Sequence, residues 1–159
     1  MLVYSHCKLF VGMCSYGFKH RLVKYGLMSD SQPSQPASDL FVLVAEDNSL
    51  NQKIVVRMVR SLGCHVEAVA NGLEVMEAVQ RRRYDVVLMD IRMPEMNGLE
   101  ATRLIRHQLP ADQQPRVYAL TAGIGPDERQ ACYDVGMDGF VAKPVVLEQL
   151  ASLFAKLSR

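Results

Sequence analysis

Five polar residues follow apolar runs of the chain, and their types suit metal and phosphate chemistry. Glu46 and Asp47 come directly after one apolar run, Asp90 closes a second, and Thr121 and Lys143 end two later ones. Carboxylates that lie close together repel, and each raises the pKa of its neighbour unless a cation is present. Mg²⁺ accepts one or two carboxylates, keeps several waters and leaves positions for phosphate oxygens. If the three acids converge, the pattern predicts a magnesium site beside Thr121 and Lys143.

Helix capping is the simpler interpretation of acids at a turn between a strand and a helix. Asn48 or Ser49 can do that capping alone, however, and both stand directly after Glu46 and Asp47. Two adjacent acids after an apolar run are more than capping requires. The metal site is therefore the favoured interpretation.

The elements that must position these residues alternate between strands and helices. Continuous apolar runs, typical of strands buried on both faces, and one alternating segment predict strands. The predicted strands are 40–45, 65–70, 84–90, 116–122 and 138–144. Amphipathic stripes predict helices. The predicted helices are 51–62, 73–83, one that opens at Asn97-Gly98, 126–135 and 146–157.

This alternation predicts a single doubly wound α/β domain, with a parallel sheet covered on both faces. In such a sheet, ligands bind beyond the carboxyl ends of the strands, near the point where the strand order reverses. The acids, Thr121 and Lys143 all fall at predicted strand ends. We therefore expect them to share one site if the first and third strands are neighbours.

One apolar residue of the first predicted helix, 51–62, lies apart from the others. Its apolar stripe is made of Asn51, Ile54, Val55, Met58, Val59 and Leu62. Val56 falls outside this stripe, so we expect it to be exposed and available to a partner helix, although lone exposed apolar residues are common.

The chain divides into three parts by composition. Residues 40–159 carry the regular pattern, and 29–39 form a Ser/Pro/Gln stretch typical of a disordered linker. Residues 1–28 contain basic residues and no acid. A poorly ordered natural tail, a transit sequence and a mistaken upstream extension with the true start at Met28 all fit that segment.

Bulk properties limit the class of protein. The 159 residues carry a net charge of +1, too balanced to indicate a nucleic-acid partner. No apolar run approaches the ~20 residues of a membrane span. The four cysteines lack C-x-x-C spacing, which favours buried thiols in a reducing compartment over zinc or disulfides. We therefore expect a cytoplasmic protein without a membrane or nucleic-acid partner.

Four segments resemble the receiver domain of response regulators, especially the receivers of hybrid histidine kinases. They are VAEDNSLNQKI (44–54), VVLMDIRMPEMNGLEATRLIR (86–106), ALTA (119–122) and MDGFVAKP (137–144). The resemblance covers residues 40–157, with spacings of 43, 31 and 22 residues from Asp47 to Asp90, Thr121 and Lys143 in turn. It implies a flavodoxin-like sheet with strand order 2-1-3-4-5 and five helices.

The resemblance also implies roles for the polar residues. Asp90 would take a phosphoryl group from a phosphohistidine donor and form an acyl phosphate. Lys143 would pair with the phosphate, and Thr121 would donate a hydrogen bond to it. Asp47, Asp90 and the backbone carbonyl of Arg92 would bind Mg²⁺ directly, with Glu46 acting partly through water.

A switch and a cis peptide bond come with the same resemblance. Thr121 would move toward the new phosphate, and Phe140, three residues before the lysine, would turn inward behind it. Ordinary core packing is the alternative for Phe140. Pro144 would follow a cis peptide bond that directs Lys143 into the site.

We expect a signalling phosphoacceptor rather than an enzyme, working as a monomer or weak dimer. Its partner would be a histidine kinase or a histidine phosphotransfer protein. A receiver-like interaction module that is never phosphorylated is the main alternative, but such modules usually lose one of the key residues. An aspartyl-phosphate phosphatase requires a second aspartate where this chain has Arg92. The segment around Gly123 and Gly125 lacks the third glycine of a dinucleotide loop.

Overall fold

The computed structural model describes residues 39–123 and 125–157. The predictions made for residues 1–28 and for the linker up to residue 38 lie outside the described residues.

Five parallel strands form one sheet in the order β2-β1-β3-β4-β5, which confirms the predicted fold. The strands are β1 (Phe41–Ala45), β2 (His65–Val69), β3 (Val86–Asp90), β4 (Arg116–Thr121) and β5 (Gly139–Ala142). The chain passes from β1 to β2 on one side and then returns to β3 on the other. The strand order therefore reverses between β1 and β3, where open α/β sheets bind their ligands.

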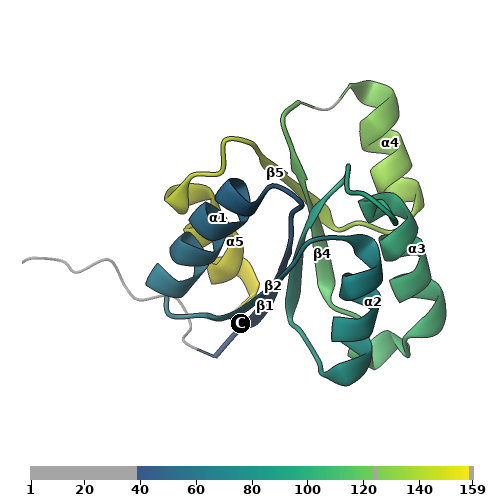
Figure 1. Cartoon of the computed structure of the whole chain (residues 1–159), viewed down its shortest axis with the longest axis horizontal. Coiled ribbons are helices and arrows are strands. Elements are labelled where there is room, and N and C mark those ends of the chain that lie inside the picture. Colours follow the sequence, from purple (N-terminus) through teal and green to yellow (C-terminus); the bar gives the residue numbers. More distant parts are fainter. Residues whose placement is uncertain (1–38, 124, 158–159) are drawn as a thin grey trace, which may run out of the picture. The chain divides into compact units, whose positions relative to one another are not determined.

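The helices cover both faces of this sheet (Figure 1). They are α1 (Ser49–Ser61), α2 (Gly72–Arg81), α3 (Gly98–Gln108), α4 (Pro126–Asp134) and α5 (Leu147–Leu157), with a short 3₁₀ helix at Ala111–Gln113. Helices α1 and α5 lie on one face, and α2, α3 and α4 lie on the other (Figure 1). The boundaries agree with the predicted elements to within a few residues; the 3₁₀ helix was not predicted.

The core consists of two apolar layers, one on each face of the sheet. The layer beneath α1 and α5 joins Val55 and Val59 to Leu150 and Phe154. The opposite layer includes Ile105 of α3 and contacts from α2 and α4. Strand β3 is buried along its whole length because both layers use it. Its alternate side chains serve opposite faces, as the continuous apolar run predicted.

Asparagine side chains begin three of the helices. Asn48 accepts hydrogen bonds from the backbone at the start of α1, and Asn71 and Asn97 do the same for α2 and α3. An N-cap of this kind satisfies backbone N–H groups that have no partner inside the helix. Asn48 therefore caps α1, which leaves the adjacent Glu46 and Asp47 free for another use.

The expected exposure of Val56 is only partial. Val56 is half-buried and packs against the apolar layer beneath α1 and α5, whereas Ile54, placed on the predicted stripe, is 45% exposed. The reason is tertiary: that layer also holds residues of α5, and it extends to the side of α1 that carries Val56. Leu50, in the first turn of α1, is 66% exposed.

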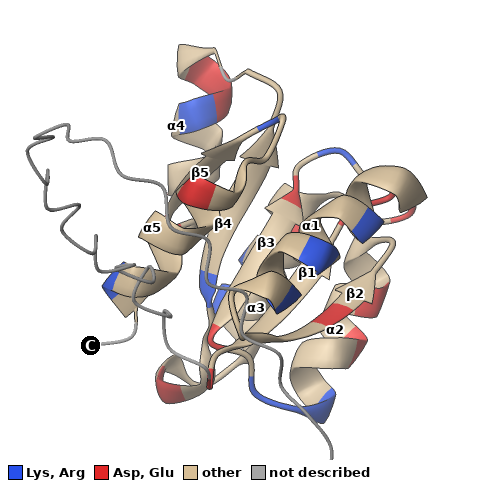
Figure 2. Ribbon diagram, turned by 90° about the vertical axis from the view of Figure 1, so that its left-hand side faces the viewer, with Lys and Arg blue, Asp and Glu red and all other residues tan. Residues whose placement is uncertain are grey.

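Charged residues of both signs are interspersed over the helices and loops (Figure 2). Helix α4, for example, carries two acidic residues in its first turn, followed by Arg129. Among the described residues, no helix combines the length and apolar character needed to span a membrane.

Candidate functional site

Three carboxylates meet at the carboxyl ends of β1 and β3. Glu46 directly follows β1 and Asp90 is the last residue of β3, and the register of these two strands places Ala45 opposite Met89. Glu46, Asp47 and Asp90 each offer a carboxylate oxygen within 4.8 Å of the others. Glu46 is 1% exposed and Asp90 9%, so little water screens their mutual repulsion. Such a group needs a cation.

Lys143 supplies one positive charge to this group. Its Nζ lies 2.6 Å from Asp90 Oδ2 and 2.7 Å from Glu46 Oε2. Burial alone would lower the pKa of Lys143, but the close contacts with Asp90 and Glu46 and their negative charges outweigh it, and the pKa is raised. The backbone N–H of Lys143 donates to the Thr121 carbonyl at 2.6 Å, and the Lys143–Pro144 peptide bond is cis.

Glu46 is held from the first turns of α1. The Asn51 Nδ2 donates to Glu46 Oε1 at 3.1 Å, and the Gln52 Nε2 donates to the backbone carbonyls of Glu46 (3.1 Å) and Val69 (2.9 Å). Glu46 Oε2 makes no hydrogen bond of normal geometry within the described residues and has only its ion pair with Lys143. The sequence analysis missed Asn51 and Gln52. The available signal was polar Asn51 on an otherwise apolar stripe.

These groups line an open cavity of about 230 Å³. Its lining consists of Glu46, Asp47, Asn48, Asn51, Asp90, Ile91, Arg92, Leu120, Thr121, Ala122, Glu128 and Lys143. The backbone N–H of Arg92 donates to Asp90 Oδ1 at 3.2 Å, and the Thr121 Oγ1 accepts from the Gly123 N–H at 3.3 Å. The structure thus brings Thr121 and Arg92 to the acidic cluster, together with Glu128, which the sequence analysis did not single out.

Phe140 lies away from this cavity, on β5. It is half-buried, and its ring makes an edge contact with the Tyr133 ring at 5.1 Å between centroids. The Arg129 guanidinium lies 5.6 Å from the same ring. Both partners belong to α4, so Phe140 connects β5 to that helix.

The chemistry of the donors fits magnesium. All the clustered side chains offer hard carboxylate oxygens, and neither histidine nor cysteine belongs to the group. Mg²⁺ prefers such ligands, whereas zinc and copper favour nitrogen and sulfur. The nearly buried Glu46 carboxylate, with one oxygen lacking a normal hydrogen bond, also suits a cation. Asp47, the third member of the cluster, is exposed and also lines the cavity.

Comparison with known sequences places residues 42–155 in one family model, described as the response regulator receiver domain. The chain is 36% identical to hybrid signal transduction histidine kinase K of Dictyostelium discoideum over 123 residues, which is 74% of this chain and 10% of that protein. It is 35% identical to the signal transduction histidine-protein kinase BarA of Escherichia coli K12, over 72% of this chain and 12% of that protein. The chain therefore spans about a tenth of the length of these relatives.

A solved structure is similar over the same region. The receiver domain of the sensor histidine kinase PA1611 from Pseudomonas aeruginosa PAO1 is 36% identical, with a TM-score of 0.68, over 75% of this chain and 97% of that one. That structure holds a magnesium ion coordinated in its active site cleft. The family model, the sequence relatives and the shared fold agree. This chain belongs to the response regulator receiver domain family.

Proposed function

We propose that this chain accepts a phosphoryl group on Asp90 from a phosphohistidine donor and relays a signal in a two-component phosphorelay. The observation that carries the proposal is the cluster of Glu46, Asp47 and Asp90 within 4.8 Å, with the Lys143 Nζ 2.6 Å from Asp90. Membership of the receiver family and the relatedness to hybrid histidine kinases support it. A cytoplasmic location is part of the same proposal.

In the proposed reaction, an oxygen of the Asp90 carboxylate forms a bond to phosphorus, and the bond between phosphorus and the donor imidazole breaks. The imidazole nitrogen keeps the electron pair and takes up a proton. Asp90 can act as the nucleophile because Lys143 offsets the charge that the phosphoryl group brings. The Thr121 hydroxyl would donate a hydrogen bond to a phosphoryl oxygen.

Magnesium would be held by Asp47, Asp90 and the Arg92 carbonyl, with Glu46 partly through water, and when bound it would supply positive charge to the phosphoryl oxygens. The group of Glu46, Asp47 and Asp90 carries excess negative charge, because among the described residues only Lys143 forms ion pairs with it, to Glu46 and Asp90. This excess explains why the residues would favour a divalent cation.

The readout would run from Thr121 to Phe140. Thr121 lines the cavity, and β4 pairs with β5 so that Ala119 lies opposite Phe140. A hydrogen bond from the Thr121 hydroxyl to a new phosphate would draw the end of β4 toward Asp90. Phe140 contacts Tyr133 and Arg129 of α4, so a change in its position would alter the surface of that helix.

The test is incubation with Mg²⁺ and acetyl phosphate, followed by the intact mass of the protein. We expect a phosphate adduct on wild type that is absent from Asp90→Asn. Asp85→Asn is the matched control, since Asp85 precedes the same strand but lies at its other end, where its carboxylate accepts the Phe41 N–H. An adduct that persists in Asp90→Asn would contradict the assignment. A wild type that neither takes phosphate nor binds Mg²⁺ would favour an interaction module.

For the partner, a histidine kinase or a histidine phosphotransfer protein, we propose a docking surface on α1 and the start of α5. Four apolar residues are exposed there: Leu50, Ile54, Val146 and Leu147. An apolar hollow of about 110 Å³ lies beside them and borders Lys143. A partner bound at this surface would hold its phosphohistidine next to Asp90.

Ile54→Glu tests this docking surface, and Leu73→Glu of α2 is its matched control because the two side chains are 45% and 46% exposed. We expect Ile54→Glu to slow phosphotransfer from the cognate donor while leaving phosphorylation by acetyl phosphate unchanged. Leu73→Glu should change neither rate. Equal effects of the two substitutions on the cognate reaction would refute the proposed surface.

A further inference from the structure

Strand β5 has few features that determine its register against β4. It has four residues, begins with glycine and pairs only with β4 at the edge of the sheet. Lys143 follows it directly, so the register of β5 sets the position of Lys143. A slip of one residue would move Lys143 by about 3.3 Å and turn its side chain to the other face of the sheet. Short, glycine-containing edge strands specify their register weakly.

Asp138 anchors the start of β5 to β4. Its backbone N–H donates to the Val117 carbonyl at 2.8 Å, and its Oδ2 accepts the Val117 N–H, also at 2.8 Å. The carboxylate therefore continues the ladder between the two strands, one position before the first paired residues, Tyr118 and Gly139.

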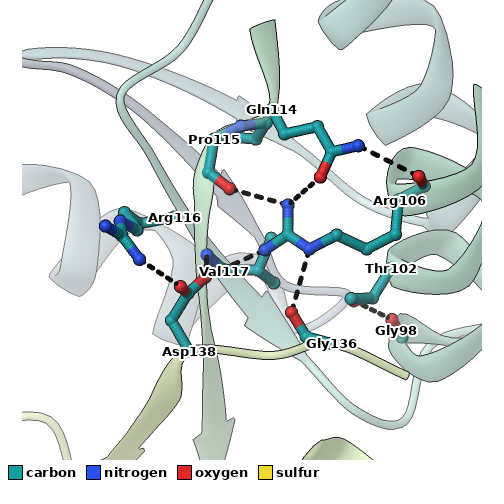
Figure 3. Close-up of polar contacts among 9 residues, drawn as sticks. All are labelled: Gly98, Thr102, Arg106, Gln114, Pro115, Arg116, Val117, Gly136 and Asp138. Atoms are coloured by element: carbon teal, nitrogen blue, oxygen red, sulfur yellow. Dashed lines mark hydrogen bonds and ion pairs between the residues drawn. The ribbon is translucent and has the colours of Figure 1, made fainter. Parts of the chain in front are cut away.

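Arg106, at the end of α3, holds this anchor in place (Figure 3). Its Nη2 donates to Asp138 Oδ2, its Nε to the Gly136 carbonyl and its Nη1 to the Pro115 carbonyl, each at 2.9 Å. One planar guanidinium thus fastens the segment before β4 to the segment before β5. A lysine cannot make this set of contacts, because it lacks the rigid fork of donors.

Two further contacts complete the cluster. The Arg116 Nη1 donates to Asp138 Oδ1 at 2.7 Å, and the Gln114 Nε2 donates to the Arg106 carbonyl at 2.9 Å. The Arg106 and Asp138 side chains are only 22% and 19% exposed, whereas those of the ion pair Arg83–Asp112 are 64% and 72% exposed. Solvent therefore screens the Arg106–Asp138 pair much less.

We propose that Arg106 and Asp138 are positioning residues for Lys143. From the far end of β5, they fix the register of that strand on β4 and so place the Lys143 Nζ against Asp90. The proposal deepens the proposed phosphoryl transfer and rests on it for the rate measurement below. It also makes a structural claim about the Lys143 backbone that can be tested without phosphate.

The rate test compares phosphorylation by acetyl phosphate with Mg²⁺ binding in Asp138→Ala and Arg106→Gln. We expect the rate to fall by about tenfold or more, since a displacement near 1 Å can cost a hundredfold. The affinity for Mg²⁺ should not fall, because Glu46 and Asp47 lie in the turn after β1 and Asp90 ends β3, away from β5. Partial unfolding would lower the rate and the affinity together. A lower rate with unchanged Mg²⁺ affinity therefore indicates a loss of positioning and not general instability.

The structural test is amide hydrogen exchange by NMR. In wild type the Lys143 N–H donates to the Thr121 carbonyl, so it should exchange slowly. We expect Asp138→Ala and Arg106→Gln to speed exchange at Lys143 by about tenfold or more while the amides of β1 and β3 keep their protection. Arg106→Lys, which keeps the charge without the fork, should give an intermediate effect on both the rate and the exchange.

Arg83→Ala is the matched control and should leave rate, affinity and exchange at wild-type values. If Asp138→Ala does not fold, Arg106→Lys and Asp138→Asn provide the same comparison. Wild-type rate and wild-type protection of Lys143 in the folded variants would overturn the proposal. If wild type itself takes no phosphate, the proposed function fails, and the exchange measurement still decides whether Arg106 and Asp138 position Lys143.

Discussion

The two ends of β5 carry opposite imbalances of charge. Beyond its carboxyl end, the carboxylates of Glu46, Asp47 and Asp90 cluster around one ammonium, that of Lys143, which pairs with Glu46 and Asp90. Before its amino end, the single carboxylate of Asp138 is bound by the guanidinium groups of Arg106 and Arg116.

This difference separates a structural cluster from a functional one. Both carboxylate oxygens of Asp138 accept hydrogen bonds from the protein, so Asp138 does not need a ligand. Glu46 is nearly buried, yet one of its oxygens lacks a normal hydrogen bond. Burying a carboxylate with too few partners lowers the stability of the fold. Proteins tolerate this loss at sites where a cation or a phosphate binds. Substitutions at the two ends should therefore differ in kind.

The largest contrast is expected for Lys143→Ala. Removing the ammonium beside Asp90 should slow phosphorylation by acetyl phosphate by about 10²–10³-fold, as loss of one preorganised charge partner does elsewhere. Mg²⁺ binding should not weaken, because the carboxylates remain. A time course of intact mass and a Mg²⁺ titration measure the two effects. Lys53→Ala, on the exposed side of α1, is the control, and a wild-type rate for Lys143→Ala would contradict the assignment.

Glycines near the two ends of β5 should differ in how much stability an added methyl group costs. In Gly98→Ala the new Cβ would overlap the Asp90 carbonyl oxygen and lie 2.8 Å from Met89 Cγ, so the backbone itself must move. We expect a loss of about 3 kcal/mol in the free energy of unfolding. Gly136→Ala would meet the flexible Arg106 side chain at 3.1 Å with φ at +91°, for a loss of about 1–2 kcal/mol.

Urea unfolding measures both losses. Gly125→Ala is the control, because its φ is −62° and nothing lies within 4 Å of the new Cβ, so its stability should stay within about 0.5 kcal/mol of wild type. A larger loss for Gly136→Ala than for Gly98→Ala would mean that the Asp90 strand end is less tightly packed than the structure indicates.

Removing one carboxylate charge should have opposite effects on the melting temperature at the two ends of β5. Without Mg²⁺, Asp47→Asn relieves repulsion among like charges and should raise the melting temperature by about 2–4 °C. Asp138→Asn removes the partner of two arginines and should lower it by at least as much. Differential scanning calorimetry in EDTA tests the signs. Adding Mg²⁺ should stabilise wild type and Asp138→Asn more than Asp47→Asn, and shifts of equal sign in EDTA would refute the contrast.

The last effect is a dependence on alkaline pH away from the site. Burial and the hydrogen bond to Glu67 raise the pKa of Tyr84 to about 12 from 10.0. Because the folded pKa lies above the unfolded one, this contribution is complete below pH 10 and is lost as the pH rises to about 12. Wild type should lose about 1–2 kcal/mol more than Tyr84→Phe across that window. Urea unfolding measures the free energy at each pH, and equal losses for wild type and Tyr84→Phe across that window would contradict this.

Much of the fold could be predicted from the chain because its signals are local. The buried strand β3 is announced by a continuous apolar run, and Asn71-Gly72 and Asn97-Gly98 stand where α2 and α3 begin. The exposure of Val56 and Ile54 could not be predicted in this way. A helical stripe shows that one face is buried, but the orientation of α1 also depends on α5, which lies about a hundred residues further along the chain.

By itself the sequence determined which residues end the strands, because strand-forming runs and the acids after them are contiguous in the chain. The position of Lys143 after β5 follows from that placement, and the meeting of Glu46, Asp47 and Asp90 follows once β1 and β3 are neighbours. Only the tertiary structure decided that Asn51 holds Glu46 and that Arg106 fastens Asp138. Arg106 and Asp138 are 32 residues apart, and their bond depends on how α3 ends against the segments before β4 and β5. Such contacts arise from the packing of helices and strands, which cannot be predicted from a local sequence pattern.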